Sequence, residues 1–321
     1  MSALAIVHPS NLLGKELRET LGRGVAGPTW QEVRLLTTVE QEVGILTDAG
    51  GAATLVQRYE PESLDGVSVA FFCGPIAANR PLLAGLPPEV TAVVLSPDAT
   101  VADGYPVVAG INARPGSAGN GGPSVLLSPH PAVVLLAHLL YPLAAFEPRR
   151  AVATVVLPAS LHDDPGIEEL FEQTRQIVAM TPRRRPQVFG AQLAFNLLPA
   201  DHAEEVAATV AAALGAVLPA EMPLSIQLVQ GGIFHCLALS LHVTCVAAPS
   251  AQAVRKALAA SPFVETAAEP RHLGPIDAAA SDKVLLGAIR RDEHGVWIWA
   301  AMDNLTRGGA LNALEIAAAV H

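Results

Sequence analysis

The segment 127-LSPHPAVV-134 places His130 between two prolines, at a point where an apolar strand would turn into a long apolar helix. Turns of this shape present a side chain at the tip of the helix, and enzymes often use that position for a nucleophile. His130 could move a proton, whereas Pro131 has neither a nucleophile nor an N–H and suits the first turn of a helix. We interpret His130 as an exposed or helix-capping histidine, and a catalytic histidine stays the alternative.

A second turn, 8-HPSNLLG-14, follows the first apolar strand and carries His8, Ser10, Asn11 and Gly14. The helix that would begin here attracts anions at its N-terminus, so weak nucleotide binding stays open. A histidine at the end of a strand is usually structural, and we interpret His8 in that way.

Cysteine and histidine also lie next to turns further along the chain. Cys73 precedes Gly74 in 73-CGPIAAN-79, and without a basic neighbour in the sequence a buried thiol is favoured over a reactive one. In 230-QGGIFHCLA-238, an extended chain would place His235 on the same face as Leu237. The adjacent Cys236 would then point the other way, and we expect it to be buried and inert.

The elements that must position these groups alternate between strands and helices in the first third of the chain, which is typical of a parallel, doubly wound sheet. The Gly-rich stretch 115–122 would mark a domain edge. Later strands are longer, and 237–244 alternates as an antiparallel strand with one covered face would. We expect strands at 3–7, 32–36, 45–47, 66–72, 92–96, 151–157, 224–230, 237–244 and 295–301, and helices at 12–22, 131–143, 166–180, 201–215 and 308–320.

Composition limits the classes of partner. The 321 residues suggest two domains, and 51% hydrophobic residues can form their cores. A net charge of -10 gives no general affinity for nucleic acid or anionic membranes, and the short basic run 183–185 is typical of a solvated loop. The apolar run 131–146 is too short for a membrane span of ~20 residues. Three cysteines without metal or disulfide spacing favour a reducing environment, so we expect a soluble, cytoplasmic protein.

Three segments resemble motifs of the aspartate-semialdehyde dehydrogenase family, within the semialdehyde dehydrogenase superfamily. The segment 192-QLAFNLLP-199 is similar to Q-x-A-F-N-x-x-P, and 128-SPHPAVVLLAHLLYPL-143 is similar to N-P-N-C-x-T-x-x-x-x-x-x-L-x-P-L. The segment 299-WAAMDNLTRGGALNALEIA-317 resembles the closing pattern W-x-x-x-D-N-L-x-x-G-A-A-x-N-A-x-x-I-A. In the closing pattern the matches are Asp303, Asn304, Leu305, Gly308, Ala310, Asn312, Ala313, Ile316 and Ala317.

The resemblance implies an α/β fold: a Rossmann-like, doubly wound NAD(P)-type domain, an inserted α+β dimerisation and substrate domain, and a C-terminal helix that returns to the first domain. We place the first domain at 1–128 with 302–321 and the second at 129–301. Active members reduce aspartyl phosphate with the reduced cofactor NADPH through a cysteine thioester, and members are dimers or tetramers.

The residues that the family uses for this chemistry are replaced. The catalytic cysteine aligns with Pro131, and the base histidine aligns with Leu237. The substrate arginine aligns with Gln230, the orienting glutamine with Leu157, and the phosphate arginine with Thr100. Without a thiolate there is no thioester for a hydride to reduce.

The family's nucleotide turn is replaced as well. Its first two glycines align with His8 and Asn11, which would fill the space of a pyrophosphate, and only Gly14 remains; the family's second Gly-rich turn aligns with 73–79 and keeps only Gly74. We therefore expect no bound cofactor and no metal. The candidate cleft residues are His8, Ser10, Asn11, Gly14, Cys73, Gly74, His130, His235 and Asn304.

These replacements predict a catalytically inactive, dimeric scaffold or regulatory protein, possible partners being a second copy or an active paralogue. One alternative is an oxidoreductase that acts on an aldehyde or acyl phosphate with NAD(P), or an enzyme of altered chemistry in the same cleft. That enzyme would need His130, His235, Cys73 and Asp163 or Asp164 to converge. A small-ligand sensor is the third hypothesis.

Overall fold

The computed structural model describes residues 3–24, 30–113, 124–182, 185–220 and 222–320, and the chain divides into two compact units. Unit 1 comprises residues 1–134 and 308–321, and unit 2 comprises residues 135–307. The chain passes from unit 1 to unit 2 within α3 (Pro131–Leu143) and returns within the π-helical segment Thr306–Leu311. The predicted Gly-rich loop 115–122 and most of the basic run 183–185 lie outside the described residues.

Unit 1 is built on one sheet of eight strands in the order β3-β4-β2-β1-β5-β6-β8-β7. All neighbouring strands are parallel except β3 and β4, which form an antiparallel hairpin at one edge. The sheet is therefore parallel and doubly wound as predicted, except for this hairpin, whose second strand β4 was not predicted. The elements are β1 (Ala3–Val7), α1 (Leu12–Gly22), β2 (Glu32–Thr37), β3 (Leu46–Ala49), β4 (Ala52–Arg58), β5 (Val67–Cys73), α2 (Ile76–Ala84), β6 (Thr91–Leu95), β7 (Tyr105–Pro106), β8 (Val125–Leu127) and α7 (Asn312–Val320).

The central strands of unit 1 are buried on both faces, as a doubly wound sheet requires. Alternate residues of β1 enter two different cores: Leu4 and Ile6 pack with α1 and α7, while Ala5 and Val7 pack with residues of α2. The C-terminal helix α7 therefore belongs to unit 1, as the resemblance implied.

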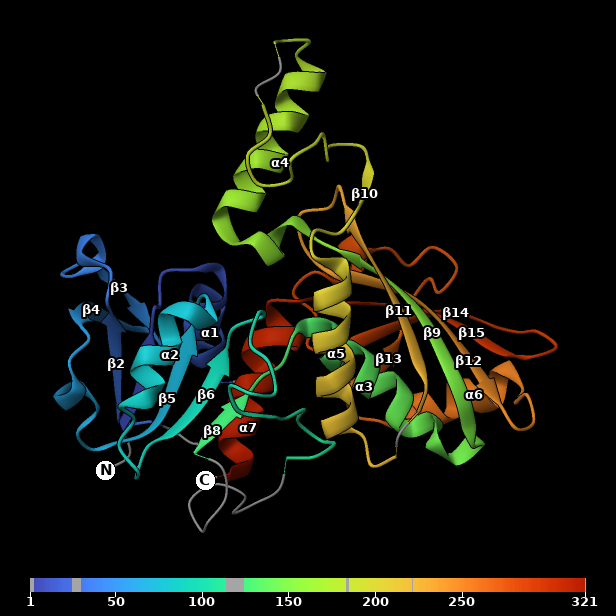
Figure 1. The fold of residues 1–321 in the computed structure, drawn as a ribbon, viewed down its shortest axis with the longest axis horizontal. Coiled ribbons are helices and arrows are strands. Elements are labelled where there is room, and N and C mark those ends of the chain that lie inside the picture. Colours follow the sequence, from blue (N-terminus) through green and yellow to red (C-terminus); the bar gives the residue numbers. More distant parts are fainter. Residues whose placement is uncertain (1–2, 25–29, 114–123, 183–184, 221, 321) are drawn as a thin grey trace. The chain divides into compact units, whose positions relative to one another are not determined.

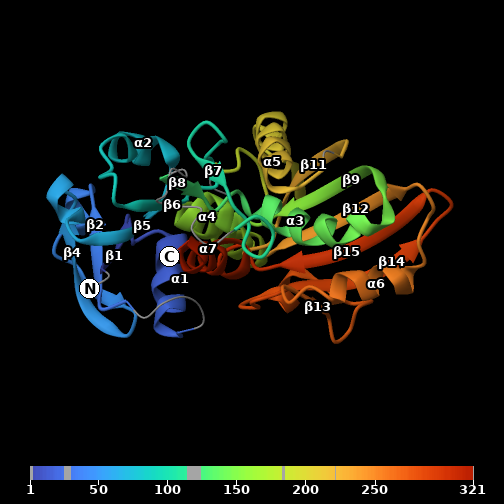
Figure 2. The same ribbon diagram turned by 90° about the horizontal axis from the view of Figure 1, so that it is seen from below.

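Unit 2 contains a mixed sheet of seven strands in the order β10-β11-β9-β12-β15-β14-β13 (Figures 1 and 2). In β12 the residues Leu239, Leu241 and Val243 are buried, and the residues between them are half-buried, which confirms the predicted alternation. The elements are β9 (Pro148–Leu157), α4 (Asp163–Val178), β10 (Leu197–Pro199), α5 (Ala203–Val217), β11 (Leu224–Gly231), β12 (Leu237–Cys245), α6 (Ala251–Ala259), β13 (Val264–Thr266), β14 (Val284–Arg291) and β15 (Gly295–Met302).

Candidate functional site

The turn after β1 is filled by its own side chains. Asn11 is the N-cap of α1, and its Oδ1 accepts the N–H of Gly14 at 2.7 Å. His8 has a φ of 56°, and its N–H donates to the carbonyl of Leu36. A Cβ on Gly74 would lie 3.3 Å from the Asn11 Nδ2 and 3.8 Å from the His8 Cβ. The structure thus brings His8, Asn11 and Gly74 together, with Ser10 half-buried in the same turn.

Gly14 has a packing role. A Cβ at this position would lie 2.7 Å from the carbonyl carbon of Pro9, so only glycine lets α1 approach the turn this closely. The Gly14 amide, which a phosphate at a helix N-terminus would use, already has Asn11 as its acceptor.

The surroundings of His8 favour the neutral form of its ring. Burial lowers its pKa, and the nearby Glu42 carboxylate opposes that shift only in part. A neutral imidazole attracts a phosphate less than a protonated one would.

The N-terminus of α2 is also occupied by the chain's own carboxylate. The N–H of Ile76 donates to both oxygens of Asp98, at 3.0 and 3.2 Å. Thr100, at the family's phosphate-arginine position, donates its N–H and its hydroxyl to Asp103. Arg80 binds the same carboxylate at 2.7 Å and lowers the pKa of Asp103 to about 2. The N–H of Ile76 and the polar groups of Thr100 are therefore already bound to carboxylates of the chain itself.

His130 caps α3 from a buried position. Its Nδ1 accepts the N–H of Ala132 at 3.1 Å, which confirms the capping interpretation, and only 6% of the residue is exposed, so the exposed alternative was wrong. Burial lowers the pKa of His130 to about 4, which keeps the ring neutral and able to accept. Pro131 follows as the first residue of α3 and is buried.

Cys73 ends β5 and is fully buried, as the favoured interpretation of a buried thiol expected. Its carbonyl accepts the Nδ2–H of the buried Asn79, which also donates to Ser96 at the end of β6. These bonds tie the carboxyl ends of two neighbouring strands together.

In unit 2, the residues that align with the family's orienting glutamine and substrate arginine are hydrogen-bonded to each other. Leu157 and Gln230 are register partners on β9 and β11, and the Gln230 Nε2 donates to the Leu157 carbonyl at 3.0 Å. The Gln230 Oε1 lies 3.2 Å from the Nε2 of His162, whose ring also packs edge-on against Phe189. Gln230 is buried and uncharged, so it lacks the charge-assisted bond that an arginine gives a carboxylate.

The segment before β12 is a turn, so the expectation that His235 shares a strand face with Leu237 was wrong. Cys236 has a φ of 73° and is fully buried, Leu237 begins β12 and is fully buried, and His235 is exposed. Glycine adopts this left-handed backbone without steric cost, so Cys236 stands at a position that favours glycine. Burial and the Asp303 carboxylate raise the pKa of the Cys236 thiol, so this cysteine is protonated at neutral pH.

Asn304 closes a buried network in unit 2. Its Oδ1 accepts the N–H of Cys236 at 2.9 Å, and its Nδ2 donates to the Ser160 Oγ at 3.0 Å. Asp303 accepts the N–H groups of Leu305 and Ala280. These residues of the closing motif hold the unit's loops in place.

Asn312, in the same motif, acts within unit 1. Its Oδ1 accepts the N–H of Ala109 at 3.0 Å, and its Nδ2 donates to the Val107 carbonyl and the Ser128 Oγ. The retained motif residues thus stabilise the fold through hydrogen bonds within the chain, and these bonds require no substrate.

Two residues of these sites were missed from the sequence. Asp98 caps a helix that begins 22 residues earlier, and His162 reaches Gln230 across 68 residues, so neither follows a local capping or motif spacing. Asp163 and Asp164 lie in the first turn of α4. The role of each candidate residue in a site stays a prediction.

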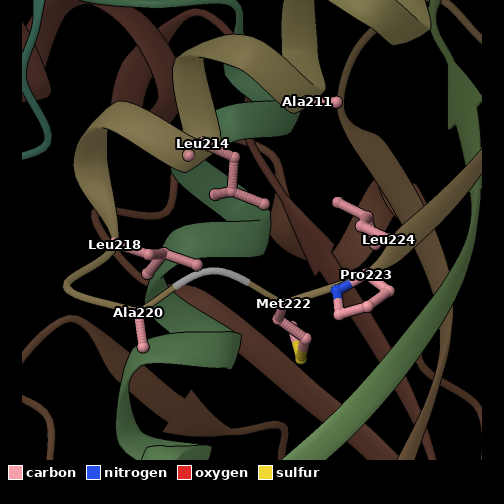
Figure 3. A pocket seen from close by; sticks show the side chains of 8 residues that line it. Ala211, Leu214, Leu218, Ala220, Met222, Pro223 and Leu224 are labelled. Carbon is pink, nitrogen blue, oxygen red and sulfur yellow. The ribbon is translucent and has the colours of Figure 1, made fainter.

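A surface pocket of about 370 Å³ lies between the end of α5 and the start of β11 (Figure 3). Its described lining is apolar and includes Leu214, Leu218, Met222 and Leu224. Such a lining offers no group for acid–base or nucleophilic chemistry.

Within the described ranges, no three His, Cys, Asp or Glu side chains gather in a way that could hold a metal ion. The described helices are also all too short or too polar to cross a membrane.

Comparison with known proteins identifies the family to which the chain is related. The model of the semialdehyde dehydrogenase dimerisation domain matches residues 140–307. Two curated relatives are named USG-1 protein homolog: that of Azotobacter vinelandii is 31% identical over 61% of this chain, and that of Pseudomonas aeruginosa is 30% identical over 65%. The matched regions span 61% and 65% of those relatives, less than two thirds of their length.

A solved structure shares the fold over nearly the whole chain. The probable aspartate-semialdehyde dehydrogenase from Pseudomonas aeruginosa has a TM-score of 0.85 and 24% identity, and the match covers 98% of this chain and 97% of that one. Because the dimerisation-domain model alone covers more than half of the sequence, this chain belongs to the semialdehyde dehydrogenase family.

Proposed function

We propose that this protein is a member of its family that does not carry out hydride transfer, and that it acts as a dimeric scaffold or regulatory protein. The observation that carries the proposal is the state of the aligned catalytic positions. Pro131 starts a buried helix, Leu237 is fully buried in a strand, and Gln230 is hydrogen-bonded to the chain itself. None of these side chains can serve as nucleophile, base or cationic anchor.

The nucleotide turn supports the same proposal for unit 1. Asn11 already accepts the Gly14 N–H, and Asp98 already accepts the Ile76 N–H, so a pyrophosphate would compete with two intramolecular bonds. It would also meet the Asp98 carboxylate, which repels it. The family cofactor NADP is therefore not expected to bind with useful affinity.

Activity and binding test the proposal together. Purified protein is incubated with NADP, phosphate and aspartate semialdehyde, and NADPH is followed at 340 nm beside a family member that retains the cysteine. Calorimetric titration with NADP is run in parallel. We expect neither NADPH nor binding heat. Turnover that persists in a Cys73→Ala/Cys236→Ala variant would show a different chemistry, and any robust turnover ends the proposal.

The dimer is proposed to form through unit 2, whose residues match the dimerisation domain. One face of its sheet leaves Val152 38% exposed, with His242 and Trp297 half-buried on neighbouring strands in register. Apolar and aromatic side chains on an open sheet face are typical of an interface. Light scattering after size exclusion should give twice the 33.3 kDa chain mass, and a monomer at micromolar concentration argues against the scaffold.

A further inference from the structure

Three side chains of unit 2 form a cluster around one aromatic ring, here called the Phe263 cluster, which consists of His138, Phe263 and Arg307. The His138 ring stacks on the Phe263 ring, with centroids 4.7 Å apart and an interplanar angle of 22°. The guanidinium carbon of Arg307 lies over the same ring, 5.2 Å from its centroid. His138 is 2% exposed and Arg307 is 1% exposed, so both side chains contact the ring away from solvent.

The members of the cluster come from segments that lie far apart in the sequence, and two of these segments connect the units. His138 lies in α3, through which the chain enters unit 2. Arg307 lies in the π-helical segment Thr306–Leu311, here called the return segment, through which the chain goes back to unit 1. Phe263 precedes β13 at the edge of the unit 2 sheet, and its carbonyl accepts the N–H of Val284. One ring anchored to the sheet therefore contacts both connections.

The chemistry of the cluster favours one fixed arrangement. The face of an aromatic ring is negative and attracts a guanidinium, and this attraction is stronger where water is excluded. Burial, and next the charge of Arg307, lower the pKa of His138 to about 3, so the histidine is neutral and does not repel the guanidinium. The His138 Nε2 is buried and makes no hydrogen bond to any described residue. The histidine ring is therefore held by packing, with Phe263 as its aromatic neighbour.

We propose that the Phe263 cluster couples the two connections between the units, so that a disturbance of one connection is transmitted to the other. Coupling between distant segments is carried by contiguous packed side chains, and here a single ring joins them. The coupling is reciprocal, because it is a free energy that both segments share. π-Helical turns are rare and frequently occur at functional positions, which suits the return segment. The proposal does not depend on the absence of catalysis.

Peptide-resolved hydrogen exchange of the full-length protein tests the coupling. Arg307→Met keeps an unbranched apolar side chain in the return segment and removes the cation from the ring. We expect exchange to become faster in the return segment and also in peptides that cover 136–143 of α3. In α3 the acceleration should be about 2- to 30-fold, which corresponds to a coupling free energy of ~0.5–2 kcal/mol.

Two further variants test the direction and the route of the coupling. His138→Leu removes the stacked ring from α3 and should accelerate exchange in the return segment, since the coupling is reciprocal. Phe263→Leu should accelerate exchange in both connections. Arg307 also interacts with other groups of the chain, and the double variant Phe263→Leu/Arg307→Met isolates its contact with the ring. In α3 the double variant should accelerate exchange by less than the product of the two single effects.

Arg255→Met is the matched control. Arg255 also binds beside β13, through the Thr266 hydroxyl and the Gly287 carbonyl, but it does not belong to the Phe263 cluster. This control should leave exchange at both connections unchanged, and circular dichroism reports the folding of every variant. Acceleration confined to the substituted connection, or an equal effect of Arg255→Met, overturns the proposal, as does full multiplication of the single effects in the double variant. If Arg307→Met does not fold, exchange in the return segment of His138→Leu decides the outcome.

Discussion

Removing the side chain of Asn312 should destabilise unit 1 far more than a typical surface substitution. Asn312 is fully buried and joins three groups: the Ala109 N–H, the Val107 carbonyl and the Ser128 hydroxyl. In Asn312→Ala these groups lose their partner where water does not reach, and each buried unsatisfied group costs ~1–3 kcal/mol. With partial relaxation, we expect the free energy of unfolding to fall by about 3–5 kcal/mol.

The chain contains a matched control for this substitution. Asn112 makes the same pattern of bonds, accepting the Val108 N–H at 2.8 Å and donating to the Pro106 carbonyl at 3.0 Å, but it is only half-buried. Water can replace its amide, so Asn112→Ala should cost about 1 kcal/mol or less.

The assay is urea unfolding followed by circular dichroism, combined with peptide-resolved hydrogen exchange. Exchange separates the units: α7 and β6 should lose protection in Asn312→Ala, while β9 and β12 of unit 2 should keep theirs. If Asn312→Ala and Asn112→Ala lower the free energy of unfolding by the same amount within 0.5 kcal/mol, burial does not strengthen the Asn312 hydrogen bonds. Our explanation of the retained motif is then wrong.

Three further outcomes are expected. The pKa of His130 is about 4 in the folded chain and 6.5 in the unfolded chain, so the unfolded chain binds the proton first as the pH falls. The free energy of unfolding should therefore fall between pH 6.5 and pH 4, by up to ~3 kcal/mol at ~1.4 kcal/mol per pH unit. His130→Asn, which keeps a capping acceptor, should show a smaller loss in urea midpoints between pH 7.5 and 5.0, and an equal loss would contradict the assignment. Gly14→Ala should lower stability by about 1–3 kcal/mol because its Cβ would lie 2.7 Å from Pro9, whereas Gly22→Ala at the end of the same helix, with its nearest neighbour at 3.4 Å, should be neutral or stabilising in thermal melts. A thiol reagent such as DTNB should label no cysteine in the folded protein and three after denaturation, and fast native labelling would contradict the burial of Cys73, Cys236 and Cys245.

Much of the fold was accessible from the sequence because strands such as Gly66–Phe72 are continuous apolar runs between turn residues. The observed β5 is Val67–Cys73, and α3 has the predicted bounds 131–143. The hairpin β3–β4 could not be predicted from the sequence, because Leu46 and Leu55 form an exposed cross-strand pair that breaks the usual alternation of buried apolar and exposed polar residues.

The candidate sites could be predicted from the sequence less well than the fold, for a physical reason. Whether His235 and Leu237 share a face depends on one backbone angle at Cys236, and a non-glycine residue with a φ of 73° leaves no signal in a pattern of residue types. The Asp98 and His162 contacts depend on tertiary packing over long sequence separations. The capping role of His130 was predictable because the cap and the helix are adjacent.

The position of α7 has a consequence for how the chain is made. Ala313, Ile316 and Ala317 complete the core on one face of the unit 1 sheet, yet they leave the ribosome after all of unit 2. Unit 2 is continuous from 135 to 307 and can fold during synthesis, whereas one apolar face of β1 and β5 is covered only in part, by α1, until α7 emerges. At roughly 5–20 residues per second, the synthesis of unit 2 takes about 10–35 seconds, and during that time the nascent unit 1 exposes apolar surface that a chaperone could bind.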